Sequence, residues 1–384
     1  MKRFATRRSA LVVLSLGLIV YPLVVSRFWS VTIGAHALIL GIIALSLIFL
    51  AGYGGMISLA QTAIAGMAAY AVAILTVPRL PQQILAIPDE PHWPAYLAVP
   101  AALAIATAMG LLFGLIAVRS QGIYLLMLTT ALGMGFFYFA DANYDFLGGH
   151  GGIPEVVSPI GYTSQAPALF YYISLGAAVA LYLGVRYLGR TPFGLALQGI
   201  RDNPRRMRAL GYSVGLHRIA AFGIAGFIAG VGGVLTVWYN GSISPGTVDL
   251  TRVIELLVIA VVGGLIFPEG AFVGALAFVL VDTFASSVPA IGGFSFRERF
   301  NTLIGLTFLL VVLFSPNGLI GIAQDLTARL RRRRSAPPRE PLTESLSRVG
   351  RDPASAHADP ASEPQEERPR ERRRTLDERT RGAP

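Results

Sequence analysis

The sequence predicts an all-α polytopic membrane protein with about ten transmembrane helices, some of them short or discontinuous, and a further helix on the cytoplasmic side. Hydrophobic residues make up 53% of the 384 residues and charged residues only 14%, whereas about a quarter of a soluble protein is charged. The charges are also unevenly placed, because residues 329–384 hold 15 of the 32 basic and 10 of the 22 acidic residues. Residues 1–328 are therefore typical of a lipid-embedded domain.

Ten apolar stretches predict the membrane spans, since about 20 apolar residues cross a bilayer. They lie at residues 10–26, 31–51, 57–77, 95–118, 123–140, 168–188, 219–239, 253–267, 270–288 and 301–322. The eighth is short, and the glycines between it and the ninth predict a tight hairpin. The first follows a basic cluster, as a signal peptide does, but "VVSRFWS" comes next and no small-residue cleavage site follows, so a retained helix is expected.

The distribution of arginines predicts the orientation, because cytoplasmic loops of membrane proteins are enriched in Lys and Arg. Ten spans place both termini on one side, together with Arg119, six arginines in the 189–218 loop and the run Arg331–Arg334. The loop 141–167 on the opposite side has three acidic residues and no basic one. We therefore expect a multi-pass protein of the bacterial inner (plasma) membrane with both termini in the cytoplasm.

The C-terminal segment, residues 329–384, has a different composition, rich in Arg, Glu, Pro, Ser and Ala. Such a sequence buries too little apolar surface to offset the entropy lost on ordering. It is expected to be a disordered cytoplasmic tail, whose first part, "RLRRRRS", would lie against anionic membrane lipids.

Several function classes are excluded or disfavoured by composition. The sequence has no cysteine, and its five histidines are not at metal-ligand spacing, so no metal site and no cofactor are expected. The one lysine, Lys2, cannot complete a phosphate-binding G-x-x-x-x-G-K-[ST] loop. If ATP is used, another chain must bind it. The net charge of +10 fits a cytoplasmic membrane surface better than nucleic acid, so no nucleic-acid partner is expected.

The 189–218 loop carries a helix start signal directly after the sixth span. Thr191 followed by Pro192 is typical of an N-cap and a first helical position. Apolar residues then recur at a helical spacing and predict one apolar face: Phe193, Ala196, Leu197 and Ile200.

A second start signal follows in the sequence "DNP". Asp202 or Asn203 would cap a second helix, Pro204 would open it, and Gly211 would end it. At about two turns this helix is too short to be stable alone in water, and its arginines each cost about 2.5–3.5 kcal/mol at mid-bilayer. An ordinary topology-setting loop would explain the charges, whereas a docking element for a cytoplasmic partner also explains the double capping.

Four stretches of the sequence, in their order and spacing, resemble branched-chain amino-acid ABC transporter permeases of the LivM type. They are "PFGLALQGIRDNPRRMRALGYSVGLHRIAAFGIAGFIAGVGGVL" (192–235), "GYGGMISLAQTAIAGMAAYAVAIL" (52–75), "GGHGGIPEV" (148–156) and "GSISPGTVDLTRVIELLVIAVVGGLIFPEGAFVGA" (241–275), within a resemblance over residues 30–325. It implies a membrane-spanning subunit of an ABC importer that forms half of a translocation path. The implied partners are a second homologous permease, two cytoplasmic ABC ATPase subunits and a soluble extracytoplasmic substrate-binding protein.

The resemblance further implies that the 189–218 loop contacts the ATPase, and that this chain is a transport subunit rather than an enzyme. The expected ATPase-coupling residues are Arg201, Asp202, Asn203, Pro204, Arg205, Met207, Arg208, Leu210 and Gly211. The chain departs from the family pattern at Arg206 and Met207, at Ala60 and Gln61, and at Phe267–Glu269. These departures bear on the docking surface and on the substrate.

Candidate residues of the translocation path lie where glycines weaken the third span. Gly55 and its neighbours precede Ser58, Gln61 and Thr62, and broken helices at membrane depth are tolerated where they face a cavity. Neutral hydroxyl and amide groups suit a zwitterionic or amide-bearing solute. Close packing of helices by small residues would explain the same glycines.

Three acidic residues lie in or near the predicted spans. Glu255 is placed near the outer face and Glu269 near the inner one, so that only Asp282 is expected to be embedded. Ionisable residues within a membrane are candidates for function, and Asp282 is therefore assigned to the path, although a buried role at a subunit interface would also retain it.

The functions that remain open are of different classes. The leading one is an ABC importer subunit for branched-chain or related amino acids, and a urea or short-amide permease of the same family is the alternative. A secondary carrier driven by protons or sodium would need ionisable groups at mid-membrane, for which only Asp282 qualifies. A membrane scaffold without transport leaves the glycine-interrupted spans unexplained.

Overall fold

The computed structural model describes residues 21–22, 25–26, 28–77, 93–156, 158–159, 167–287 and 318–321. All of them belong to the unit Met1–Ala328. Most of the first and tenth predicted spans and the whole segment 329–384 lie outside the described residues, so the predictions for them stay predictions.

The described residues are almost entirely helical, and they include an isolated antiparallel β-bridge between Ile153 and Ile243. In chain order the elements are η1 (Phe28–Ala35), α2 (His36–Gly54), α3 (Gln61–Thr76), α4 (Ala95–Ala117), α5 (Ile123–Ala142), α6 (Tyr144–Leu147), η2 (Gly149–Gly151), α7 (Pro167–Leu188), α8 (Pro192–Asp202), α9 (Pro204–Ala209), α10 (Val214–Asn240), η3 (Pro245–Thr247), α11 (Leu250–Gly263) and α12 (Gly270–Ser287).

Five helices of the described part, with η1 and α2 counted as one, are long and apolar enough to cross a membrane. Two shorter apolar helices, α3 and α12, accompany them. Each of the eight predicted spans that fall within the described residues contains a helix. The all-α membrane class is thereby confirmed, including its short and interrupted helices.

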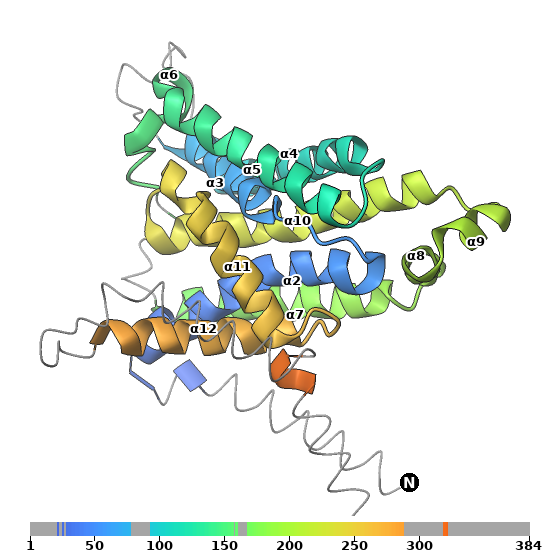
Figure 1. Ribbon diagram of the computed structural model, residues 1–384. Coiled ribbons are helices and arrows are strands. Elements are labelled where there is room, and N and C mark those ends of the chain that lie inside the picture. The colour runs from blue at the N-terminus through green and yellow to red at the C-terminus, as the bar shows by residue number, and fades with distance from the viewer. Residues whose placement is uncertain are drawn as a thin grey trace, which may run out of the picture. The chain divides into compact units, whose positions relative to one another are not determined.

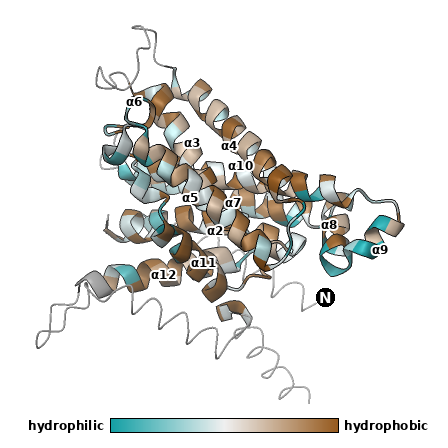
Figure 2. Ribbon diagram, turned by 45° about the horizontal axis from the view of Figure 1, so that its top comes forward, coloured by the Kyte–Doolittle hydropathy of each residue, from teal (hydrophilic) through white to brown (hydrophobic). Residues whose placement is uncertain are grey.

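Helices α2 and α10 form the centre of the bundle (Figure 1). In their most apolar windows 78% and 67% of the residues are buried, against 22% to 33% in α4, α5 and α7. The outer helices therefore leave apolar side chains free to meet lipid or another subunit. Figure 2 shows these apolar surfaces in brown, with hydrophilic residues gathered around α6 and around α8 and α9, at the two ends of the bundle.

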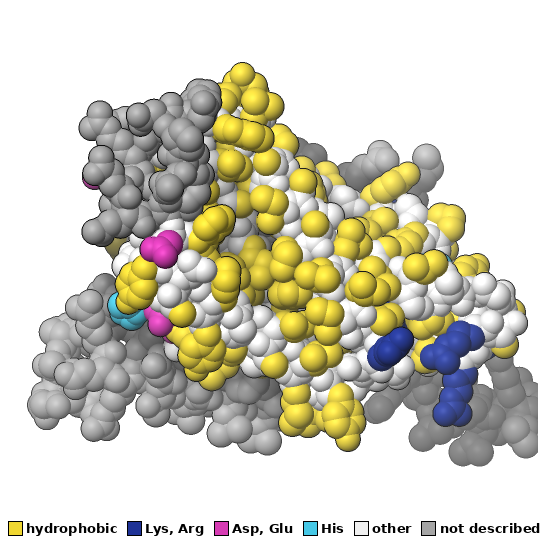
Figure 3. Space-filling model, turned by 90° about the horizontal axis from the view of Figure 1, so that it is seen from above, with side chains coloured by type: hydrophobic (Ala, Val, Ile, Leu, Met, Phe, Trp, Pro, Cys, Tyr) yellow, Lys and Arg dark blue, Asp and Glu magenta, His cyan; other side chains and the backbone are white. Residues whose placement is uncertain are grey.

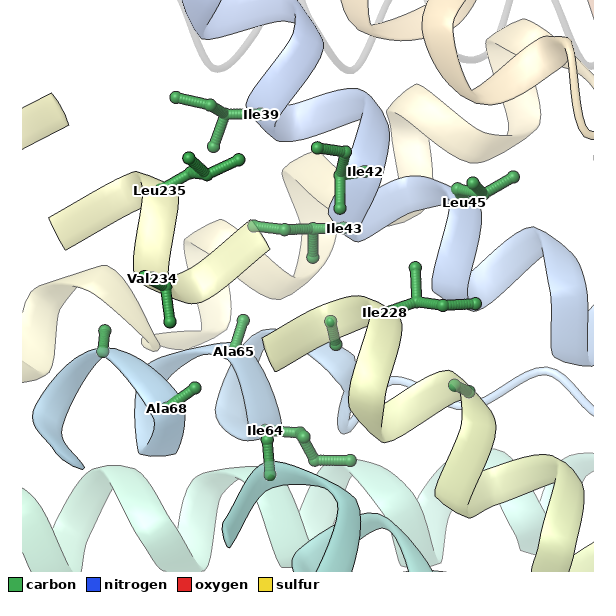
Figure 4. Packing of buried hydrophobic residues seen from close by; sticks show 14 of the residues in the cluster. Ile39, Ile42, Ile43, Leu45, Ile64, Ala65, Ala68, Ile228, Val234 and Leu235 are labelled. Atoms are coloured by element: carbon green, nitrogen blue, oxygen red, sulfur yellow. The ribbon is translucent and has the colours of Figure 1, made fainter. Parts of the chain in front are cut away.

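The core is built from aliphatic side chains of α2, α3 and α10 that pack together (Figure 4). Those labelled there are Ile39, Ile42, Ile43, Leu45, Ile64, Ala65, Ala68, Ile228, Val234 and Leu235. Because lipid tails are as apolar as these side chains, close packing rather than escape from water holds such helices together.

A seam of small residues brings α4 and α10 into backbone contact. A β-carbon on Gly110 would lie 2.6 Å from the carbonyl oxygen of Phe222, and one on Gly226 would lie 2.7 Å from the carbonyl oxygen of Ala106. Only residues without a side chain allow this approach, which is typical of small-xxx-small packing in membranes. These two helices are therefore held together along their length.

The predicted hairpin between the eighth and ninth spans is confirmed as the turn from α11 to α12. Helix α11 ends at Gly263 and α12 begins at Gly270. Glu269 in this turn accepts hydrogen bonds from the Tyr182 hydroxyl at 2.6 Å and from Arg186 Nη1 at 3.2 Å. The hairpin is thus attached to the end of α7.

Candidate functional site

Helix α8 begins and buries its apolar face as the sequence predicts. The Thr191 hydroxyl oxygen accepts a hydrogen bond from the Gly194 amide at 3.4 Å, and Pro192 is the first helical residue. Leu197 and Ile200 have no exposed surface. The helix therefore has a fixed position on the end of the bundle.

Helix α9 follows the same rule at its start but buries nothing. The Asn203 side-chain oxygen accepts a hydrogen bond from the Arg206 amide at 3.0 Å, which identifies Asn203 as the cap. Gly211 has a φ of +88° and supplies the predicted left-handed stop. None of the six residues of α9, all of which the structure describes, is buried.

Arg201 connects α8 to the end of α2. Its Nη1 donates to the carbonyl oxygen of Gly52, and its Nε donates to Asp202 Oδ1 at 3.0 Å. Its aliphatic stem lies on Gly55, where a β-carbon would come within 2.5 Å of Arg201 Cγ. A carbonyl at a helix C-terminus has no partner within its own helix, and Arg201 supplies one.

The nine residues expected to couple to an ATPase therefore divide into four groups. Arg201 ties the loop to α2 and is paired with Asp202, while Asn203, Pro204 and Gly211 shape its backbone. Met207 packs on Gly199 of α8, and Arg208 lines a separate pocket described below. Arg205 and Leu210 project into open space, the latter 64% exposed.

The predicted break before α3 lies next to this attachment. Gly55 has a φ of +64°, and its amide donates to Ala51 while the amide of Met56 donates to Leu50. This left-handed residue ends α2, as glycine commonly does at helix C-termini. The chain then crosses residues 57–60 before α3 begins at Gln61.

A buried polar cluster surrounds the start of α3. Ser58 and Gln61 have no exposed surface, and Gln61 Nε2 donates to the Ser58 hydroxyl at 3.5 Å. The Leu59 amide donates to the hydroxyl of Thr129 on α5 at 3.1 Å. Gln61 Oε1 has no hydrogen-bond partner in the described part of the chain.

A cavity of about 230 Å³ lies further along α3, between α2, α10, α11 and α12. We call it the polar cavity. Its lining residues are His36, Ile39, Leu40, Ile43, Thr62, Ala65, Gly66, Ala69, Gly233, Thr236, Tyr239, Asn240, Ile243, Thr247, Arg252, Glu255, Leu256, Ile259 and Asp282. It is smaller than pockets for drug-sized ligands, which measure about 300–1,000 Å³.

The polar cavity contains charges of both signs beside an aliphatic wall. Arg252 Nη1 donates to Glu255 Oε2 at 2.7 Å. The imidazole of His36 stacks on the Tyr239 ring with centroids 5.0 Å apart. The hydroxyl of Thr62, a residue only 7% exposed, has no hydrogen-bond partner within the described residues. Such a site can hold a small solute with both charged and apolar parts.

The structure brings together only some of the residues assigned to the path. Thr62 and Asp282 both line the polar cavity. Ser58 and Gln61 belong to the cluster at the start of α3, and Gly55 lies against Arg201.

The sequence placed Glu255 near the outer face and did not assign it to the path. Its carboxylate is 15% exposed and shares the polar cavity with Asp282. His36 and Arg252 were missed as well. The spacing of Arg252, directly before a predicted span, and of a carboxylate one turn later inside it could have signalled the pair of Arg252 and Glu255.

The glycine-rich loop after α6 is a series of tight turns, as expected. Gly148, Gly149 and Gly152 all have positive φ, and Ile153 pairs with Ile243 beyond the end of α10. His150 is an exposed loop residue whose Nδ1 lies 3.0 Å from Asp141. The loop thus closes over the end of the bundle that is remote from α8 and α9 (Figure 1).

The visible face of the molecule separates its charges (Figure 3). Basic side chains gather at one end, acidic side chains and a histidine at the other, and hydrophobic side chains lie between them. An apolar bundle with one basic end is typical of a multi-pass membrane protein. A small cavity of mixed charge inside it is typical of a protein that handles a small polar solute.

Comparisons with known proteins define the family. The family described as branched-chain amino acid transport system / permease component matches residues 30–312. The chain belongs to this family, and it is of the LivM type. The match takes in all the helices from α2 to α12.

Individual relatives agree with this assignment. The high-affinity branched-chain amino acid transport system permease protein LivM of Salmonella typhimurium is 25% identical over 330 residues, or 79% of this chain and 72% of that protein. The probable branched-chain amino acid transport permease protein LivM of Methanocaldococcus jannaschii is 27% identical over 235 residues, or 58% and 67%. The galactose/methyl galactoside import permease protein MglC of Haemophilus influenzae is 28% identical over 204 residues, or 51% and 60%.

Proposed function

We propose that this chain is the membrane-spanning permease subunit of an ABC importer for branched-chain or related amino acids. It forms half of the translocation path, and a second, homologous permease forms the other half. ATP is hydrolysed by two cytoplasmic ATPase subunits that grip the 189–218 loop. A soluble binding protein delivers the solute to the opposite end, at the glycine-rich loop after α6.

The observation that carries this proposal is the link from Arg201 to the end of α2. A loop that only set the topology would need its charges but no fixed contact with the bundle. Here the guanidinium holds the carbonyl of Gly52 and covers Gly55, the residue at which α2 breaks before α3. Movement of α8 is thereby transmitted to a discontinuity inside the bundle.

The polar cavity supports an amino acid as the solute. The Asp282 carboxylate has no hydrogen bond from any described residue and suits an ammonium group, while Arg252, although paired with Glu255, has further guanidinium N–H groups for a carboxylate. The aliphatic wall formed by residues such as Ile39 and Ile259 suits a branched side chain. Urea and short amides are neutral, so they would leave the Asp282 carboxylate without a cationic ligand, which is costly in a low-dielectric site.

The orientation follows from the same assignment. The loop with Arg205 and Arg208 faces the cytoplasm, where the ATPases reside, and both termini lie on that side. Residues 329–384 form a cytoplasmic tail that follows the permease domain 1–328. The acidic loop 141–167 faces outward, where its charge would complement a basic surface on the binding protein.

Transport assays in liposomes that contain both permeases and the ATPases, with binding protein supplied outside, test the coupling. Arg201→Ala should keep the ATPases bound but reduce ATP-driven leucine uptake about tenfold or more, because one charge-assisted hydrogen bond contributes about 1.5–3 kcal/mol. Arg190→Ala, an exposed arginine at the start of the same loop, is the matched control and should transport normally. Equal uptake by both variants would refute the proposed link.

The same liposomes separate this function from an ion-coupled carrier. Uptake should stop when the ATPases are omitted and should be indifferent to an imposed proton or sodium gradient. Gradient-driven uptake that is lost in Asp282→Asn would instead identify a secondary carrier. Competition of leucine with urea and short amides for the binding protein then decides the class of solute.

A further inference from the structure

A second pocket, of about 460 Å³, lies where the α4–α5 connection meets the start of α10, at the end of the bundle that carries α8 and α9. Its lining residues are Val118, Arg119, Gln121, Arg208, Tyr212, Ser213, Val214, Gly215 and Arg218. We call it the arginine pocket, because three of these nine lining residues are arginines and none of the nine is acidic.

Arg218 is the unusual member of this set. It is only 7% exposed, and its Nε has no hydrogen-bond partner within the described residues. Buried cations are normally paired, because an unpaired one carries a large desolvation cost. The nearby Arg208 repels it rather than neutralising it. Within the described residues, no carboxylate is paired with the Arg218 guanidinium.

The start of α10 adds further donors to the same pocket. Ser213 is its N-cap residue but makes no capping hydrogen bond with its side chain. The amides of the first turn, including those of the pocket residues Val214 and Gly215, thus have no side-chain acceptor. Free amides at the N-terminus of a long helix, together with arginines, favour phosphate over a smaller or neutral ligand.

The surroundings of the pocket indicate that this phosphate belongs to a lipid. Tyr212, which lines the pocket, is 44% exposed, and Leu216 in the next turn is 68% exposed. Gln121, which also lines the pocket, is followed at the start of α5 by Ile123 and Tyr124, which are 62% and 73% exposed. Apolar and aromatic side chains at the level of a charged pocket are typical of the membrane interface. Acyl chains can therefore lie beside the pocket while a headgroup occupies it.

We propose that the arginine pocket binds the phosphate of an anionic phospholipid from the cytoplasmic leaflet. Arg119, Arg208 and Arg218 neutralise the headgroup, and the first turn of α10 donates amide hydrogen bonds to it. Because Arg208 belongs to α9 and Arg218 to α10, a bound lipid would fix the 189–218 loop against the α4–α5 connection.

A fluorescent reporter can test this on the full chain, which contains no cysteine. Gln121→Cys, at the rim of the pocket, is labelled with a polarity-sensitive dye, and the protein is placed in phosphatidylcholine nanodiscs. Increasing fractions of phosphatidylglycerol should change the fluorescence to a plateau. Inorganic phosphate in solution should produce no comparable change.

Three variants of the labelled protein locate the effect. Arg208→Gln, on an exposed helix, and Arg218→Gln should each weaken the response about ten- to hundredfold, as expected for lost charged hydrogen bonds. Arg206→Gln removes the same charge from α9 outside the pocket and should weaken it by no more than about fivefold, the general effect of one arginine near an anionic surface.

Three outcomes would overturn the proposal. The first is a response without saturation, or one that is equal in Arg208→Gln and Arg206→Gln. The second is an equal response to inorganic phosphate, which would assign the pocket to a soluble anion. The third is a response only to added ATPase subunits, which would assign the arginines to a protein carboxylate. None of these outcomes bears on transport, so the permease function is tested separately.

Discussion

Helices α8 and α9 have the same start signal, a capping side chain followed by proline, yet they differ in almost everything else. Helix α8 covers the end of the bundle with Leu197 and Ile200, whereas α9 has no buried residue. Helix α8 is packed against the bundle, whereas α9 is exposed and is bounded by a capping residue at each end. The comparison shows that the same start signal can precede a buried helix or an exposed one, so that caps alone do not tell how a loop helix packs.

The comparison predicts that a charge on the buried face of α8 destabilises the protein, and this is the largest effect that we expect. Ile200→Asp should cost several kcal/mol, because an isolated carboxylate loses its hydration in an apolar site. Leu195→Asp places the same group on the exposed side of the helix, where Leu195 is 59% exposed, and should be tolerated. Thermal melting of both purified variants measures the difference, and equal melting temperatures would mean that α8 does not pack as described.

Substitutions on α9 are expected to weaken association with the ATPase rather than to destabilise the protein. Arg205→Glu together with Gly211→Asp should abolish capture of the ATPase in a pull-down, because it reverses an exposed charge and disturbs the left-handed stop at Gly211. Membrane insertion should remain intact. Arg190→Glu, an exposed arginine at the start of the same loop, is the control. Undiminished capture by the double variant would remove α9 from the interface.

A smaller effect should follow from removing the cap of α9. Asn203→Ala loses the hydrogen bond from the Arg206 amide, and the loss of such a cap costs about 1 kcal/mol. Hydrogen exchange in residues 204–209 should accelerate about fivefold, as that energy implies. Ser213→Ala should leave exchange in α10 unchanged, because Ser213 makes no capping bond. Equal acceleration in both helices would contradict the assigned caps.

The smallest effect is expected where the two helices touch. A β-carbon on Gly199 of α8 would lie 2.8 Å from the sulfur of Met207. Since methionine is flexible, Gly199→Ala should displace α9 slightly and cost less than about 1 kcal/mol. ATPase affinity should fall by less than about fivefold, the equivalent of that energy. A complete loss of binding would show that the angle between α8 and α9 matters more than the surface of α9.

Local signals explain why so much of this loop could be predicted from the sequence. Caps, prolines and the left-handed Gly211 act within a few residues, and apolar periodicity identified the buried face of α8 through Leu197 and Ile200. The membrane spans could be predicted equally well, because the thickness of the bilayer sets the length of the apolar stretches. Even the interruption between α2 and α3 was marked by its own glycines.

The candidate sites were less predictable, since they depend on contacts between distant parts of the chain. The sequence treated Arg201 and Arg205 alike, although one turns inward to Gly52 and the other projects outward. Glu255 and Asp282 are far apart in the sequence and meet only because α11 and α12 form a hairpin. No periodicity within either helix carries that information.

The two ends of the 189–218 loop lead to different central helices. Through Arg201 the loop holds α2, and through α9 it runs directly into α10. Since α2 and α10 supply two walls of the polar cavity, a twist applied to the loop from below would act as a lever that shears one wall past the other. Because the glycine seam brings α4 and α10 into backbone contact, we would expect α4 to move together with α10.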